Sequence, residues 1–94
     1  MKVIREKNYG QYTFINKACD EVEKIVQPYS KIRLRTGKIY TDIHLSIKQG
    51  INMYNTKIHI IDNETNFVNA TGHIQNNDSV FFVDRRGNNI EFLN

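Results

Sequence analysis

Alternation of polar and apolar residues is most regular across residues 31–48, where Gly37 interrupts it. Successive side chains of a strand point to opposite faces of a sheet, so this pattern predicts half-buried strands. One strand covers residues 30–35 and the next covers 38–48, with a tight turn at Gly37. Tyr40 falls on the polar face of the second strand. The opposite face is predicted to comprise Ile39, Thr41, Ile43, Leu45 and Ile47.

A different period precedes these strands, between residues 12 and 26. Apolar residues recur there at intervals of three and four, which is typical of one face of an amphipathic helix. They are Phe14, Ile15, Ala18, Val22, Ile25 and Val26. Thr13 is a suitable N-cap, and Pro28 ends the helix because its ring blocks continuation.

Further strands are predicted from short apolar or alternating runs that are bounded by Asn, Asp and Gly. They cover residues 53–62, 67–75, 80–83 and 89–93, and residues 1–5 form a short strand or an arm. Gly72 is expected to mark a bulge or bend. The run 80–83 is apolar on both faces, so we expect it to be central and buried. Residues 84–88 form a tight turn.

These elements indicate a single α+β domain over residues 1–94. One N-terminal amphipathic helix is followed by a five- to six-stranded antiparallel sheet. Two arrangements remain open at this point. The sheet either lies open with the helix across it or curls into a barrel.

Charge and cysteine content limit the function classes. The formal net charge is +3, which favours attraction to polyanions without establishing a nucleic-acid function. Cys19 is the single cysteine, so no intramolecular disulfide can form and a reducing compartment is the simplest expectation. No apolar run has the length of a signal peptide or membrane span. We therefore expect a cytoplasmic protein that contacts no membrane.

A basic stripe is the clearest candidate site. Lys31, Arg33 and Arg35 share the polar face of the strand at 30–35, with Lys38 just past the turn and Tyr40 beyond it. Alternating cations can neutralise phosphates, and a tyrosine can stack on a base. The alternative interpretation is that the cations keep an edge strand from pairing with other chains.

Catalytic patterns are sparse. The histidines His44, His59 and His73 stand on separate predicted strands without the spacing of a metal site, and no Gly-rich phosphate loop occurs. Asp42 and His44 could share a face with Arg33 and Arg35, as the carboxylate base, the histidine acid and the cationic clamp of a small ribonuclease would. The alternative is an ordinary cross-strand ion pair. We expect neither a cofactor nor a metal.

The segment from Phe82 to Phe92 resembles the second motif of the Sm/LSm family, in which a hydrophobic strand, an Arg-Gly turn and a short apolar strand follow one another. The hairpin Arg35–Tyr40 is similar to the first hairpin of that fold. The resemblance implies an SH3-like barrel, and it would allow several copies to assemble into a ring through their strand edges. It also implies a uridine-type RNA site lined by Asn52, Arg86, Gly87 and Asn88. The chain departs from the family pattern at Asp42, Lys48 and Gly50.

These observations favour a small non-catalytic module that binds nucleic acid, RNA rather than DNA. The residues expected to contact it are Lys31, Arg33, Arg35, Lys38, Tyr40, Asn52, Arg85, Arg86 and Asn88. One alternative is a phage or mobile-element inhibitor or adaptor that blocks a host protein with an acidic surface, such as a defence nuclease. The other is the small ribonuclease.

Overall fold

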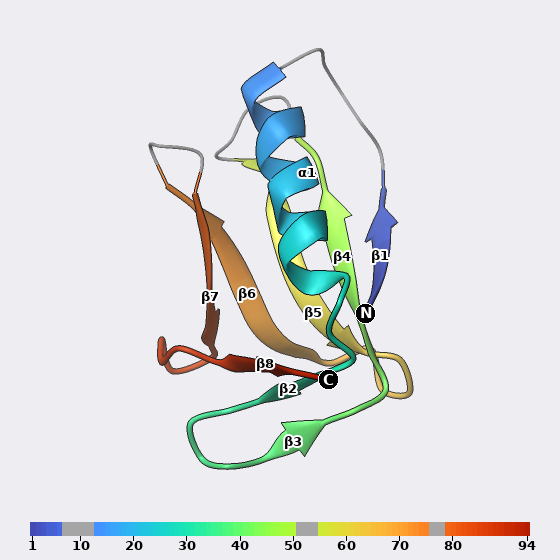
Figure 1. Cartoon of the computed structure of the whole chain (residues 1–94), viewed down its shortest axis with the longest axis vertical. Coiled ribbons are helices and arrows are strands. Elements are labelled where there is room, and N and C mark those ends of the chain that lie inside the picture. Colours follow the sequence, from blue (N-terminus) through green and yellow to red (C-terminus); the bar gives the residue numbers. More distant parts are fainter. Residues whose placement is uncertain (7–12, 51–54, 76–78) are drawn as a thin grey trace.

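The computed structural model describes residues 1–6, 13–50, 55–75 and 79–94, and side chains in the helix from Lys17 on. Figure 1 shows one helix lying against a twisted sheet, with a smaller sheet below it. In chain order the elements are β1 (Lys2–Arg5), α1 (Thr13–Val26), β2 (Lys31–Arg33), β3 (Ile39–Tyr40), β4 (Ile43–Lys48), β5 (Lys57–Asp62), β6 (Val68–Ile74), β7 (Val80–Asp84) and β8 (Glu91–Leu93). The α+β class and the mostly antiparallel pairing are confirmed.

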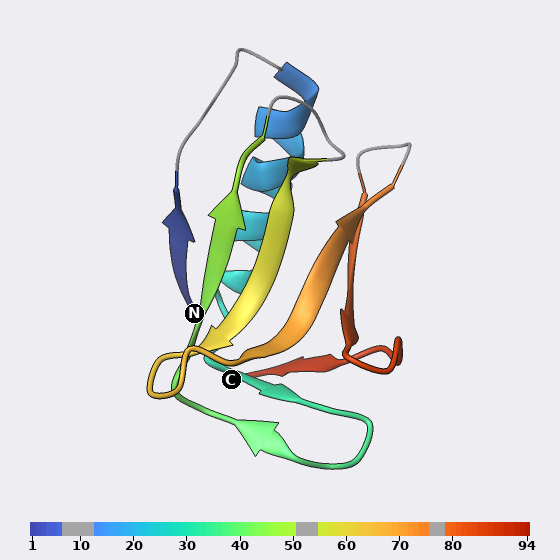
Figure 2. The same cartoon turned by 180° about the vertical axis from the view of Figure 1, so that it is seen from behind.

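The larger sheet has the order β1-β4-β5-β6-β7, and the smaller has the order β3-β2-β8. All pairs are antiparallel except β1 with β4, which run parallel. The helix covers one face of the larger sheet, as the two opposite views show (Figure 1, Figure 2). The segment predicted as a short strand or an arm is therefore the strand β1.

The helix ends at Val26 as predicted, and Ala18, Val22 and Val26 of the predicted stripe are buried. Ile25, which was predicted to lie on the same apolar face, is 41% exposed, and the side chains of Phe14 and Ile15 lie outside the described part of the helix. Cys19, Val22 and Val26 have no solvent exposure and pack against Leu45 and Ile60 of the sheet. Burying one valine or leucine side chain completely contributes about 1.5–3 kcal/mol to stability, so this contact helps to hold the helix on the sheet. After Val26 the chain turns through residues 27–28, as Pro28 requires.

An ionic contact ties β1 to the helix. The guanidinium of Arg5 pairs with the carboxylates of Asp20 and Glu23, the latter at 2.9 Å between Nε and Oε1. Burial lowers the pKa of Arg5, but the hydrogen bond to Asp20 and the charges of both carboxylates outweigh it and leave that pKa raised. The contact therefore holds the parallel edge strand against the helix that follows it.

The strand predicted over residues 38–48 is two strands in different sheets. β3 pairs with β2, and β4 pairs with β1 and β5. Alternation changes phase at the break, so Ile39 is 48% exposed whereas Tyr40 packs against the core. The prediction that Ile39 faces inward and Tyr40 outward is wrong because a chain that passes between sheets need not keep one alternation across the break.

Gly72 is not the bulge that was predicted. It lies within the regular pairing of β6, opposite Ile58 on one side and Phe82 on the other. A β-carbon there would stand 2.7 Å from Ile58 Cγ2 and 2.9 Å from Phe82 Cε1. Glycine is needed for close packing. The register shift of β6 occurs three residues earlier, at Asn69.

Residues 80–83 were predicted to be central, and this is also wrong. β7 is an edge strand of the larger sheet, and Phe81 is 39% exposed while Phe82 is buried. The sheet does not close into a barrel. β8 forms its ladder with β2, and among the described residues an isolated bridge pairs Val83 of β7 with Asn89, which precedes β8. The two sheets consequently stay separate, as Figure 2 shows from behind.

Candidate functional site

Two tight turns meet at one end of the smaller sheet. In the β2–β3 turn the Leu34 amide donates to the Lys38 carbonyl at 2.9 Å, and in the β7–β8 turn the Asp84 amide donates to the Asn88 carbonyl at 2.8 Å. Arg35 Nη1 donates to Asn88 Oδ1 at 3.2 Å and joins the two turns. Segments about fifty residues apart in sequence therefore form one surface.

Glycine makes both turns feasible. Gly37 has a φ of 94° and Gly87 a φ of 84°, in the left-handed region that side chains disfavour. The amide of each glycine donates to the first carbonyl of its turn, Leu34 or Asp84. The expected turns at these positions are thus confirmed.

Asp84 organises the second turn. Its side chain is 9% exposed, and its Oδ1 accepts hydrogen bonds from the amides of Arg86 and Asn88, each at 2.9 Å. These bonds fix the backbone from which Arg85 and Arg86 project. The carboxylate is therefore a positioning group for the two arginines.

Substituting Asp84 with alanine should lower the free energy of unfolding by about 2 kcal/mol, because two turn amides lose a charged acceptor. Asp84→Asn keeps an acceptor oxygen and should lose about half as much. Urea denaturation of the three proteins measures both values. An alanine variant as stable as the unsubstituted protein would contradict this role.

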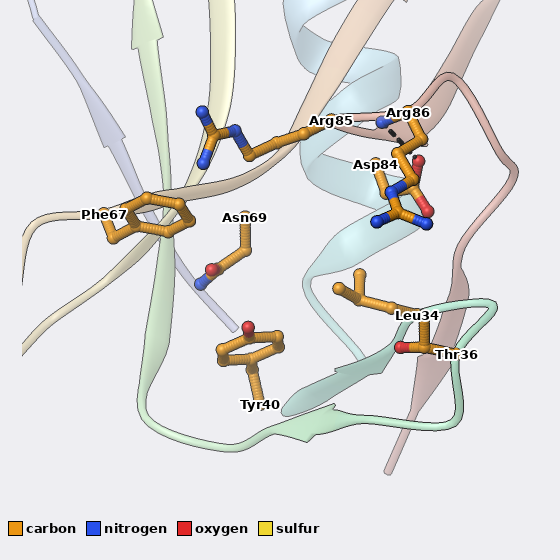
Figure 3. Close-up of a pocket in the computed structure, with 8 residues that line it drawn as sticks. All are labelled: Leu34, Thr36, Tyr40, Phe67, Asn69, Asp84, Arg85 and Arg86. Atoms are coloured by element: carbon orange, nitrogen blue, oxygen red, sulfur yellow. Dashed lines mark hydrogen bonds between the residues drawn. The ribbon is translucent and has the colours of Figure 1, made fainter.

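A cavity of about 210 Å³ opens between the two turns and the start of β6. Figure 3 shows its lining residues, which are Leu34, Thr36, Tyr40, Phe67, Asn69, Asp84, Arg85 and Arg86. A second hollow of about 450 Å³ adjoins it and shares Tyr40, Phe67 and Asn69. Lys38 also lines this second hollow. The two hollows form one concave region with an aromatic centre.

Asn69 occupies an unusual position in this region. Ile60 pairs with Ala70 and Ile61 with Val68, so Asn69 is the extra residue of a bulge in β6. It is 2% exposed, and neither Oδ1 nor Nδ2 has a hydrogen-bond partner among the described residues. In Figure 3 its carboxamide lies between the rings of Tyr40 and Phe67. The bulge thus directs an unsatisfied amide toward the aromatic centre.

Cations lie over the aromatic rings. The Arg85 guanidinium stands 4.8 Å from the centroid of Phe67, and Lys38 Nζ stands 4.8 Å from the centroid of Tyr40. Arg86 is exposed at the cavity rim. With Arg35 this makes four cations, which we call the turn cluster: Arg35, Lys38, Arg85 and Arg86. The nearby carboxylates of Asp62 and Asp84 accept backbone amide hydrogens of their own turns.

The predicted basic stripe is divided by the fold. Arg33 lies opposite Glu91 in the register and pairs with it at 2.6 Å, and Lys31 lies opposite Leu93. Tyr40 lies opposite Ile32, on the other face of the smaller sheet from these two cations. Lys31 and Arg33 are therefore separated from the cavity, whereas Arg35 joins the turn cluster. Asn52 lies outside the described residues.

Phe67 and Asn69 were missed by sequence reasoning. Phe67 was assigned only as the start of a strand, and it is 44% exposed above the cavity. A signal was present at Asn69, since it is a polar residue in the run Val68-Asn69-Ala70 of a strand that packs on the core. The missing information was the bulge, which decides the face on which Asn69 lies.

The ribonuclease residues are not assembled as that hypothesis requires. Asn63 Nδ2 donates to Asp42 Oδ1 at 3.0 Å and Asn63 Oδ1 contacts His44 Nδ1, so an amide stands between acid and imidazole. His44 belongs to the larger sheet and Arg33 to the smaller. A second histidine, His59, was not part of that hypothesis. Burial lowers its pKa, and the positive charges of Lys57 and Lys48 lower it further.

Within the described residues, no set of three or more His, Cys, Asp and Glu side chains is arranged to hold a metal ion. None of the helical segments described has the length and apolar character that crossing a membrane requires. Comparisons with protein-family models, curated proteins and solved structures found no match to this chain.

Proposed function

We propose that the protein is a small nucleic-acid-binding module that binds single-stranded RNA at the concave region between its two turns. The observation that carries the proposal is the combination of the turn cluster with two aromatic rings around one cavity. Cations that follow a groove bind the phosphate backbone, and aromatic rings stack on bases of any sequence. This pairing of residue types is typical of single-strand binding surfaces.

The local charge balance supports the same proposal. Three cations of the turn cluster, Lys38, Arg85 and Arg86, line the two hollows, and Arg35 is held to the neighbouring turn by its bond to Asn88. The carboxylates that line the same hollows are those of Asp62 and Asp84. Both carboxylates accept hydrogen bonds from backbone amides of their own turns, whereas Arg86 is exposed at the rim of the cavity. An anionic ligand therefore meets a net positive surface. The preference for RNA over DNA rests on the Sm/LSm resemblance, and the test includes both.

Binding of fluorescein-labelled single-stranded RNA, measured by anisotropy at increasing salt, tests the proposal. We expect the logarithm of the association constant to fall linearly with the logarithm of salt, with a slope of about −3 if four cations contact phosphates. Duplex RNA and single-stranded DNA of the same sequence serve as comparisons. Absence of binding at low salt, or a slope near zero, would overturn the proposal.

A further inference from the structure

We propose that the cavity around Asn69 takes one unpaired nucleobase of the bound strand, and that the Asn69 carboxamide recognises the hydrogen-bonding edge of that base. This inference rests on the proposed function and names the part of the ligand that enters its cavity. It separates two tasks within one site. The turn cluster binds phosphates, and Asn69 with its flanking rings binds a base.

The first argument is the unsatisfied amide. Both polar atoms of the Asn69 carboxamide are buried and neither has a partner, which is an unfavourable arrangement within a folded protein. A carboxamide presents one donor and one acceptor side by side. Adjacent donor and acceptor groups on a base edge complement this pair, as in the bidentate contact that asparagine makes with adenine. A ligand of that chemistry satisfies both atoms together.

The second argument is the shape of the space. The cavity of about 210 Å³ exceeds the roughly 30 Å³ of one water several-fold and is below the roughly 300–1,000 Å³ of pockets that enclose whole drug-sized ligands. Tyr40 and Phe67 flank Asn69, as Figure 3 shows, and offer flat faces to a planar ring. A base fits inside while its sugar and phosphate remain outside.

The third argument places the phosphate. Arg85 lies over the Phe67 ring, and Arg86 leaves the adjoining turn at the rim. A base that enters beside Phe67 brings its own phosphates to these two guanidinium groups. Phe67 is 44% exposed, so its ring has room to move outward and admit a base to the covered amide. A base within a duplex is stacked between its neighbours and can enter a cavity only by leaving the stack, so the cavity favours a single strand.

The experiment compares intact and abasic single strands on two proteins, the unsubstituted chain and Asn69→Leu. Labelled RNA strands of one length carry uracil, cytosine, adenine or no base at the central positions, so their phosphates are the same. We expect the unsubstituted protein to bind at least one intact strand about 5- to 150-fold more tightly than the abasic strand, which is the range for a bidentate base contact. Asn69→Leu should reduce that difference to the part that stacking on Tyr40 and Phe67 supplies, should abolish the preference among the three bases, and should keep its abasic affinity.

Thermal unfolding of Asn69→Leu checks its fold, and we expect it to melt at or above the temperature of the unsubstituted protein because two orphaned polar atoms are removed. If the variant does not fold, the comparison of intact with abasic strands on the unsubstituted protein decides alone. Equal affinity for the two strands would overturn the inference and leave the proposed function in place. Failure of every strand to bind would overturn both.

Discussion

Replacing Gly72 with alanine should lower the free energy of unfolding by about 1–3 kcal/mol, the usual range for overpacking a well-filled core. The added methyl group would lie 2.7 Å from Ile58 Cγ2 and 2.9 Å from Phe82 Cε1, closer than atoms in contact allow. Both neighbours are buried and belong to strands on either side of β6, so neither can move freely. The entropic gain from replacing glycine, about 0.4–1 kcal/mol, offsets only part of this loss.

Urea denaturation measures this effect, and two variants control for its cause. Thr71→Ala alters the half-buried residue that precedes Gly72 in β6. It should lower the free energy of unfolding by less than Gly72→Ala does. Phe82→Leu shortens one of the two obstructing side chains. The double variant Gly72→Ala/Phe82→Leu should therefore be more stable than the sum of the single effects predicts, by about 0.5 kcal/mol or more. Simple additivity would contradict a steric origin.

Neutralising Arg85 and Arg86 with glutamine should weaken binding of single-stranded RNA by on the order of 10- to 100-fold. Both guanidinium groups belong to the turn that borders the cavity, and neither takes part in the hydrogen bonds that hold that turn. The fold should therefore persist. The salt dependence should also become shallower, by about 1.4 in slope for two lost phosphate contacts on a single strand.

The matched control removes the same charge elsewhere. Lys17 and Lys24 are exposed on the helix, so Lys17→Gln/Lys24→Gln changes the net charge equally at a distance from the cavity. We expect that variant to bind nearly as well as the unsubstituted protein. Equal weakening by the two double substitutions would show that overall charge, rather than this site, governs binding.

The helix was predictable because its signal is local. Fourteen residues show an apolar stripe at the helical period, and Pro28 marks the end. The turns at Gly37 and Gly87 were predictable for a similar reason, since a positive φ strongly favours glycine. Each of these features depends on residues within a few positions of one another, so the sequence alone specifies them.

Features that depend on distant residues were not predictable. Alternation through residues 38–48 is consistent with one long strand, and only the pairing of β3 with β2 and of β4 with β5 divides it. The face on which Tyr40 lies follows from that division. Asn69 depends on a bulge whose position is set by the neighbouring strand β5. All four residues of the turn cluster were therefore among the predicted binding residues, whereas the cavity beside them was not predicted.

The pairing of β2 with β8 has a consequence for the order of folding. Arg33 and Glu91 are 58 residues apart in sequence. Their strands pair with each other, and this pairing brings the two turns together. Closing a loop of that length costs entropy before any contact in it is gained, so such pairings tend to form late. The surface that the two turns form together is therefore expected to assemble later in folding than the helix and the individual turns.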